Sequence, residues 1–209
     1  MSSVGLLYVG AVLFINGLML IGKVPGKSAA VLNFFVGGMQ VIFPTLIIVA
    51  GANDPAVILG ASGLYLFGFT YLYVAFNQVF DLPGEGLGWF SLFVAICAVA
   101  FSVVNFTTGD DPVFGVIWLI WAVLWFLFFL LLALGRAELT EATGWFTIIV
   151  AHLTGTLPAF LLLTGNFDAS MRNALLMAVA GVAALAVAFV LARRTSSAST
   201  PEVTAPHPA

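Results

Sequence analysis

The sequence predicts an all-α membrane protein with seven transmembrane helices, and three observations support this prediction. Hydrophobic residues make up 62% of the 209 residues and charged residues only 7%, whereas an ordinary soluble domain is about a quarter charged. The charged residues lie in short connecting segments or near the C-terminal end. Between them run seven apolar stretches, each long enough to cross a hydrocarbon core of about 30 Å as a helix. Because a backbone in lipid must satisfy its own hydrogen bonds, these stretches are expected to be helices and not open strands.

The expected spans are residues 4–22, 28–50, 56–78, 87–108, 113–134, 143–164 and 173–192. The first is kept as a true span because the residues before it lack the positive segment of a signal peptide. Turn-forming residues separate the next spans, at Val24-Pro25-Gly26, Asn53-Asp54-Pro55, Leu82-Pro83-Gly84 and Asp110-Asp111-Pro112. Every connection is short, so no separate soluble domain is expected.

Individual spans carry further signals. In the second and third, small residues such as Gly37 and Gly68 favour close helix packing. Pro44 in the second span and Pro158 in the sixth each remove a backbone hydrogen bond and are expected to kink their helices. The seventh span is rich in Ala, Val and Leu and is expected to be a peripheral packing helix. From residue 195 onward the chain is rich in Ser, Thr, Pro and Ala, which predicts a disordered tail.

The positive residues predict the orientation of the chain. Odd-numbered connections and the C-terminal end carry Lys23, Lys27, Arg136, Arg193 and Arg194. The even-numbered connections carry one positive residue and several aspartates. Positive residues favour the cytoplasmic side, so the N-terminus is expected outside and the C-terminus in the cytoplasm.

Composition excludes several classes of function. A net charge of −3 gives no basic patch for nucleic acid. Two histidines and one cysteine cannot form a metal site, and no intramembrane acid accompanies a Ser or His, so neither an enzyme nor a cofactor or metal is expected. A retinal protein would need a lysine in its last helix, and the only lysines are Lys23 and Lys27.

Three tryptophans of the fifth span form the most specific pattern. Trp118, Trp121 and Trp125 have the spacing i, i+3, i+7, which places three indoles on one helical face. Trp also favours membrane interfaces, and an aromatic belt is the alternative interpretation. A belt would hold one level, whereas this stripe climbs about 10 Å along the helix.

The third span adds aromatic and polar groups. Phe67 and Tyr71 share one face, and Asn77 lies near the end of the span. Buried hydroxyls and amides need partners or water, which neighbouring helices could supply. Asn16, Asn33, Gln40 and Asn105 add further neutral hydrogen-bonding groups. Together with the tryptophans, these groups could line a narrow slot for a small, flat, uncharged polar molecule, with rings on its faces and hydrogen bonds at its edges.

His152 falls in the middle of the sixth span. A lone intramembrane histidine is a functional candidate, and a neutral histidine bonded across helices is the alternative. No carboxylate lies within any span to partner it.

Several blocks of sequence resemble one known family. Over about residues 4–164, the stretches Leu6-Leu7-Tyr8-Val9-Gly10, Asn16-Gly17, Lys23-Val24, Lys27-Ser28, Asn33 to Gly38, Leu66 to Tyr73, Ser91 to Ile96 and Trp118 to Trp125 are similar to the urea/amide channel family (AmiS/UreI). The resemblance implies a ring of protomers, usually a hexamer, each with its own pore through a six-helix bundle. It also implies selectivity for urea or short aliphatic amides and service to a cytoplasmic urease or amidase in a bacterial inner membrane.

By position, the resemblance implies that Phe67, Tyr71, Trp121 and Trp125 line constrictions and that Leu13 and Leu124 are apolar residues of the pore. Trp118 is assigned to the same path. Asn16, Asn77 and His152 are assigned as polar or gating groups. The expected domains are a six-helix channel bundle at 1–165, a seventh helix at 166–194 and a disordered cytoplasmic tail at 195–209.

Three departures from the family pattern matter. The family's urea channel has a carboxylate in its last pore helix, where this chain has Val150. The acid-gated member has long outer loops that contain histidine, whereas the outer connections of this chain are short and contain no histidine. The seventh span also has no counterpart in the six-helix urea channel.

These observations predict a passive channel that selects small neutral amides or urea by aromatic and aliphatic constrictions and excludes ions. The alternative is a proton-coupled amide transporter in which His152 is the relay group.

Overall fold

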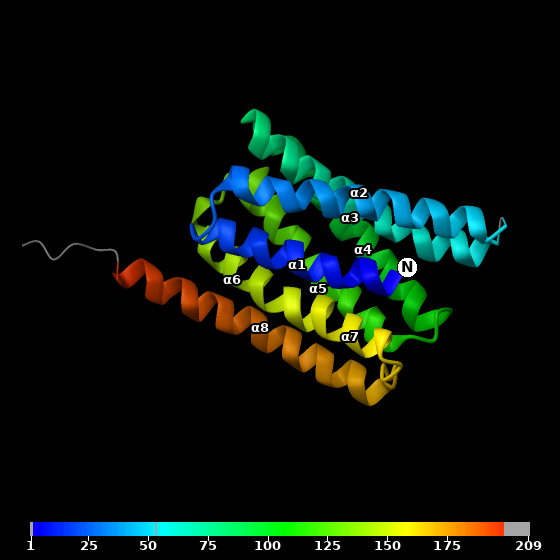
Figure 1. The fold of residues 1–209 in the computed structure, drawn as a ribbon. Coiled ribbons are helices and arrows are strands. Elements are labelled where there is room, and N and C mark those ends of the chain that lie inside the picture. The colour runs from blue at the N-terminus through cyan, green and yellow to red at the C-terminus, as the bar shows by residue number, and fades with distance from the viewer. Residues whose placement is uncertain (1, 53, 199–209) are drawn as a thin grey trace, which may run out of the picture.

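The computed structural model describes residues 2–52 and 54–198, and within them seven apolar helices are long enough to cross a membrane (Figure 1). Five are uninterrupted: α1 (Ser2–Leu20), α2 (Gly26–Ala50), α3 (Pro55–Phe80), α4 (Glu85–Thr107) and α5 (Pro112–Leu132). The sixth span joins η1 (Ala137–Leu139), α6 (Thr140–Val150), η2 (Ala151–Thr156) and α7 (Leu157–Leu163), and α8 (Met171–Ala198) is the seventh. The described residues contain no strand. The predicted all-α class and the seven membrane-length helices are therefore confirmed.

Aspartate followed by proline starts two of the helices. The side chain of Asp54 accepts a hydrogen bond from the backbone N–H of Ala56 at 2.8 Å, and that of Asp111 accepts one from Phe114 at 2.9 Å. The prolines at 55 and 112 occupy the first helical positions, where no N–H is needed. The sequence features predicted as turns are thus the N-terminal caps of α3 and α5.

The sixth span is widened in its middle. Residues of η2 form a π-helical segment in which the N–H of Leu157 donates to the carbonyl of His152. Pro158 follows directly and has no N–H to donate, so the regular α-helical hydrogen bonding cannot continue through it. The expected irregularity at Pro158 is therefore a wide turn just before the proline. Pro44, by contrast, lies inside the continuous α2.

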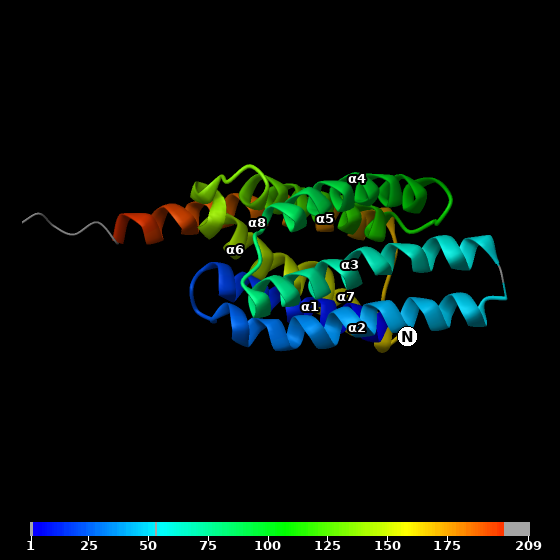
Figure 2. The same cartoon turned by 90° about the horizontal axis from the view of Figure 1, so that it is seen from above.

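The helices pack mainly as pairs: α2 against α3, α4 against α5, and α1 against α6 and η2 (Figures 1 and 2). Glycine allows the closest approaches. A Cβ atom at Gly155 of η2 would lie 2.7 Å from the Cα of Gly10 in α1, and one at Gly37 of α2 would lie 3.0 Å from the carbonyl oxygen of Gly68 in α3. No larger residue fits at these crossings, which hold α1, α2 and α3 in place around the core.

Helix α8 lies on the outside of the bundle, against α5 and α6 (Figure 1). Its buried face is made of small residues, including Ala174, Gly181 and Ala184, as expected for a peripheral packing helix. The helix runs to Ala198 and so passes the predicted start of the tail at residue 195. The hydroxyl of Thr195 bonds to the Glu141 carboxylate at 3.4 Å, which ties this last part to α6. The rest of the predicted tail, residues 199–209, lies outside the described residues.

Candidate functional site

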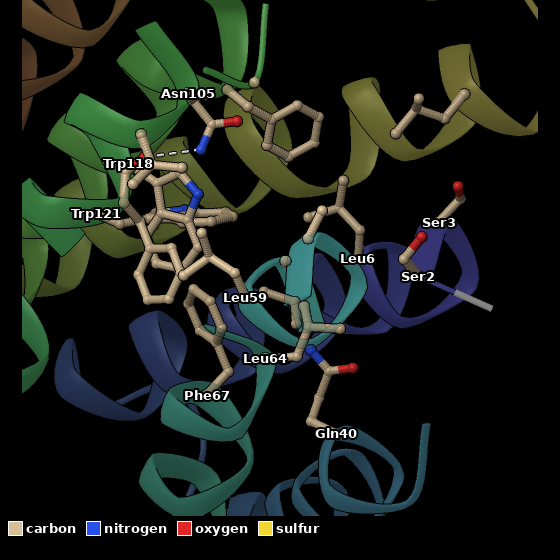
Figure 3. A pocket seen from close by; sticks show the side chains of 18 of the residues that line it. Ser2, Ser3, Leu6, Gln40, Leu59, Leu64, Phe67, Asn105, Trp118 and Trp121 are labelled. Carbon is tan, nitrogen blue, oxygen red and sulfur yellow. Dashed lines mark hydrogen bonds between the residues drawn. The ribbon is translucent and has the colours of Figure 1, made fainter. Parts of the chain in front are cut away.

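A cavity of about 430 Å³ opens between α1, α3, α4 and α5 (Figure 3). Its walls are mostly apolar, and its inner end is formed by the rings of Phe67, Trp118 and Trp121. Exposed Ser2 and Thr108 lie on its rim. We refer to it as the larger cavity.

A second, smaller cavity of about 30 Å³ is lined by residues that include Leu13, Asn16, Tyr71 and Trp125. Its volume corresponds to the share of about one water molecule. We refer to it as the smaller cavity.

The two cavities lie in opposite halves of the bundle. Along α1, α3 and α5, residues of the larger cavity precede those of the smaller one, for example Val9 before Leu13 and Trp121 before Trp125. Along α4, which runs the opposite way, the order is reversed. The cavities therefore face each other end to end across the middle of the protein.

A partition of aromatic rings separates them. The ring of Phe67 is the centre of this partition: its centroid lies 4.7 Å from that of Trp121 and 5.0 Å from that of Trp125, and it meets both rings edge to face, at 74° and 79°. Trp118 lies 5.6 Å away and Tyr71 6.4 Å away. These rings are packed against one another, and Phe67 is stacked on Tyr71 with an angle of 30° between their planes.

Hydrogen bonds fix two of the indoles. The Nε1–H of Trp121 donates to the hydroxyl of Thr154 in η2 at 2.9 Å, and that of Trp125 donates to the hydroxyl of Thr70 in α3 at 3.3 Å. Each threonine in turn donates to the carbonyl four residues earlier in its own helix. The tryptophan face of α5 is therefore linked to α3 on one side and to the widened turn of the sixth span on the other.

Two asparagines form a reciprocal pair beside the smaller cavity. Asn16 donates to Asn33 at 2.9 Å, and Asn33 donates back at 2.6 Å and to the carbonyl of Ala29 at 2.9 Å. Both are buried. The hydroxyl of Tyr71, which also lines this cavity, is buried without a hydrogen-bond partner.

The structure brings most of the predicted site residues together. Phe67, Trp118 and Trp121 line the larger cavity, and Leu13, Asn16, Tyr71 and Trp125 line the smaller one. All three tryptophans are buried, as a functional stripe requires and a lipid-facing belt does not.

Three predicted residues lie elsewhere. Leu124 is fully buried in the core but lines neither cavity. Asn77 lies at the end of α3, where its amide donates to the carbonyl of Pro83 at 3.4 Å. His152 is exposed on the outside of the helix bundle, with its ring 5.2 Å from that of Phe14. His152 therefore lies away from both cavities, and its spacing in the sequence did not predict this.

Charged groups are absent from the lining of both cavities, as far as the described residues go: no carboxylate, ammonium, guanidinium or imidazole group is among them. The polar groups that remain are hydroxyls, amides and indole N–H groups. Such a site can offer hydrogen bonds and ring surfaces to a neutral molecule but cannot replace the hydration of an ion.

Two residues of the site were not singled out from the sequence: Thr70 and Thr154, which anchor the indoles. Gln40 of α2 was named from the sequence only as one of several neutral amides, and the structure places it in the lining of the larger cavity. The threonines carry no distinguishing signal, because Thr is common in membrane helices and often bonds to its own backbone.

Comparisons with known proteins fit this geometry. Residues 1–166 match the AmiS/UreI family transporters. The chain is 54% identical to a putative amidate substrates transporter protein of Mycolicibacterium smegmatis, over all of this chain and 97% of that protein. It is 39% identical to the acid-activated urea channel of Helicobacter pylori, over 75% of this chain and 94% of that protein.

The chain also matches solved structures of a urea channel. A cryo-EM structure of the Helicobacter pylori urea channel in its closed state matches with a TM-score of 0.73 and 37% identity, covering 80% of this chain and 100% of that one. A crystal structure of the same channel gives a TM-score of 0.71 at 35% identity, again over 80% and 100%.

Proposed function

This chain belongs to the AmiS/UreI family of transporters, and from that premise we propose that it is a passive channel for small neutral amides and urea. The family is one of transporters and channels and not of enzymes. The observation that carries the proposal is an uncharged path: two cavities meet at an aromatic partition, and the described residues that line them carry no charge. The names of the relatives, an amidate-substrate transporter and a urea channel, support the same class of solute.

Selection against ions follows from the lining. An ion that enters the larger cavity loses hydration and meets only rings, aliphatic groups and neutral dipoles, which cannot repay the desolvation cost. Urea or acetamide has fewer hydrogen bonds to lose and has flat faces that can lie against Phe67, Trp121 or Trp125. The channel therefore passes neutral amides but not ions, so that transport does not discharge the membrane potential.

The partition sets the size limit. The smaller cavity holds about 30 Å³, so a solute passes only when the rings of Phe67, Tyr71 and Trp125 move aside. Passive conduction needs sites that bind weakly enough to release the solute again. Edge-to-face ring contacts, each worth about 0.5–1.5 kcal/mol, are weak enough to open and close repeatedly.

Stopped-flow light scattering on proteoliposomes tests this function. Vesicles that contain the protein should take up urea, acetamide or propionamide faster than empty vesicles, while a pH-sensitive dye inside them reports no added proton leak. If no short amide and no urea permeates faster than through empty vesicles, the proposed function is wrong.

The proposed setting is a hexameric ring in a bacterial inner membrane, with the N-terminus outside and the C-terminus in the cytoplasm, where an amidase or urease consumes the solute. Native mass spectrometry of the detergent-solubilised protein tests the hexamer. The exposed position of His152 gives no support to the proton-coupled alternative, because a relay must lie on the path.

A further inference from the structure

Gln40 is the unusual residue of the larger cavity. It extends from α2 between α1 and α3, and in Figure 3 its amide lies beside Leu64, on the same side of the cavity as Phe67. The residue is 1% exposed, and its Oε1 atom is buried without a hydrogen-bond partner. A buried amide oxygen without a partner destabilises a fold, so Gln40 stands in a place where packing alone would favour an apolar residue.

The other hydroxyl and amide side chains that line this cavity are, unlike Gln40, half-buried or exposed. Ser2 and Thr108 are exposed on the rim, and Asn105 already donates to the carbonyl of Phe101 at 2.8 Å. The indole of Trp121 donates to Thr154. Gln40 is therefore the one deeply buried amide of this cavity within the described chain, and its Oε1 atom has no hydrogen-bond partner.

Space for this amide is provided by Gly5 of α1. A Cβ atom at position 5 would lie 2.5 Å from the Oε1 of Gln40. Any residue larger than glycine would thus displace the end of the Gln40 side chain. The amide position depends on two helices that meet at this point.

A pair of buried amides elsewhere in this protein shows how two amide groups can bond to each other. Asn16 and Asn33 exchange two hydrogen bonds, each amide giving one N–H and accepting one with its oxygen. Gln40 has the same chemical group, but among the residues that the structure describes its Oε1 atom has no amide partner to complete such a pair. The missing partner has the chemistry of a primary carboxamide.

We propose that Gln40 is a specificity-determining residue that recognises the primary-amide edge of the solute in the larger cavity. This inference rests on the proposed channel function and names its solute class more closely. The N–H and C=O on one edge of a primary amide pair with the amide of Gln40, whose rotation about its Cγ–Cδ bond can present either atom to the solute.

Stereochemistry makes the proposal selective. A primary amide has an N–H on the same side as its C=O, so it can form the reciprocal pair. In a secondary amide the trans form dominates and places the N–H opposite the C=O, so only one of the two bonds can form. The apolar residues nearby, including Leu6 and Leu64, suit the alkyl group of an aliphatic amide better than the second amino group of urea.

Two isomers provide a matched test: propionamide is a primary amide, and N-methylacetamide is a secondary amide with the same atoms. After subtraction of the empty-vesicle rates, the wild-type channel should pass propionamide about tenfold faster, the ratio expected from one additional hydrogen bond. Gln40→Met keeps the length of the side chain and removes the amide, and should bring this ratio close to one. Gln78→Met is the matched control, because Gln78 lines neither cavity.

Gly5→Ala provides a second variant that keeps Gln40 and moves its amide, and it should also lower the ratio. Thermal unfolding in detergent adds a readout that separates recognition from structure. Because Gln40→Met removes an unpaired buried amide, its unfolding midpoint should equal or exceed that of the wild type. A clearly lower midpoint would show that the amide stabilises the fold, and it would overturn the proposal.

The failure of this inference differs from the failure of the proposed function. If the wild type transports urea and amides but does not separate the two isomers, or if Gln40→Met keeps the wild-type ratio, the role of Gln40 is wrong while the channel function stands. If the wild type transports none of these solutes, both are wrong.

Discussion

Replacing Trp125 by alanine tests the partition most directly. Trp125 is 1% exposed, its ring packs edge to face on Phe67 with a centroid distance of 5.0 Å, and it forms part of the smaller cavity. Its removal should join this cavity to the space around Phe67. The expected result is a faster flux of urea and acetamide and a weaker rejection of larger amides such as butyramide.

The cost to the fold can be worked from the same contacts. In a bilayer the transfer of apolar surface contributes little, because lipid is as apolar as the core, so the remaining cost is mainly the void. A void on the order of 100 Å³ costs about 2.4 kcal/mol at about 24 cal/mol per Å³. Loss of the ring contact with Phe67 adds about 0.5–1.5 kcal/mol. Thr70 keeps its hydrogen bond to the carbonyl of Leu66 at 2.7 Å, so no unpaired hydroxyl is left behind.

Trp118→Ala is the matched control. Trp118 stacks on Phe101 with a centroid distance of 4.7 Å and lines the larger cavity, which is already open. Removing it enlarges existing space on one side of the partition, where Phe67 still contacts Trp121 and Trp125. Permeability to butyramide relative to urea, measured by stopped-flow on proteoliposomes, should therefore rise clearly for Trp125→Ala and little for Trp118→Ala.

Two results would refute this reasoning. One is an unchanged size limit in folded Trp125→Ala, since the partition would then lie elsewhere. The other is an equal effect of the two substitutions, since the level of the barrier along α5 would then be wrongly assigned.

Three further predictions concern other parts of the protein. Urea permeability should change little between about pH 7 and pH 5, because neither cavity is lined by a charged or imidazole group in the described chain; a steep rise at pH 5 in stopped-flow traces would implicate exposed His152 or the loop aspartates. Asn33→Leu should lower the unfolding midpoint because it leaves Asn16 unpaired, at a cost of about 1–3 kcal/mol. In thermal unfolding assays, the double substitution of Asn16 and Asn33 by leucine should recover part of that loss. Full additivity of the two single effects would argue against their pairing. Gly181→Leu should clash with Ile120, which lies 2.7 Å from a Cβ built at Gly181, and should therefore lower the unfolding midpoint. The ratio of urea to acetamide permeability should stay unchanged, because α8 lines neither cavity. An altered ratio would show that α8 shapes the path.

The helices could be predicted because lipid allows few alternatives. Apolar length and charge placement determine where a span can lie, and Asp-Pro pairs mark where α3 and α5 begin. The extension of the sixth span to Ala137 and the widened turn before Pro158 were not predicted in detail. The widened turn lies at a tertiary contact, the close approach of Gly10 to Gly155, that no local pattern contains.

Helical spacing predicted the aromatic part of the site, and the family resemblance added Leu13 of the smaller cavity. The tryptophans of α5 and the pair Phe67 and Tyr71 point inward together because residues three and four apart share a face. The position of His152 could not be derived in this way, because a π-helical turn changes the angle between successive residues. Gln40 could be noted as a polar residue within a span, but its relation to the larger cavity needs the positions of three helices.

Two buried polar atoms without partners belong to residues on opposite sides of the partition. Gln40 Oε1 belongs to a residue of the larger cavity, Tyr71 Oη belongs to a residue of the smaller one, and neither atom has a hydrogen-bond partner. Each such group costs the fold about 1–3 kcal/mol, whereas the Asn16–Asn33 pair shows that this chain can satisfy buried amides. Sequences depart from full polar satisfaction mainly where function requires it. In the proposed channel, a solute would exchange water for the Gln40 amide, cross the rings and meet the Tyr71 hydroxyl, so that the two unpaired groups act as weak sites on either side of one barrier.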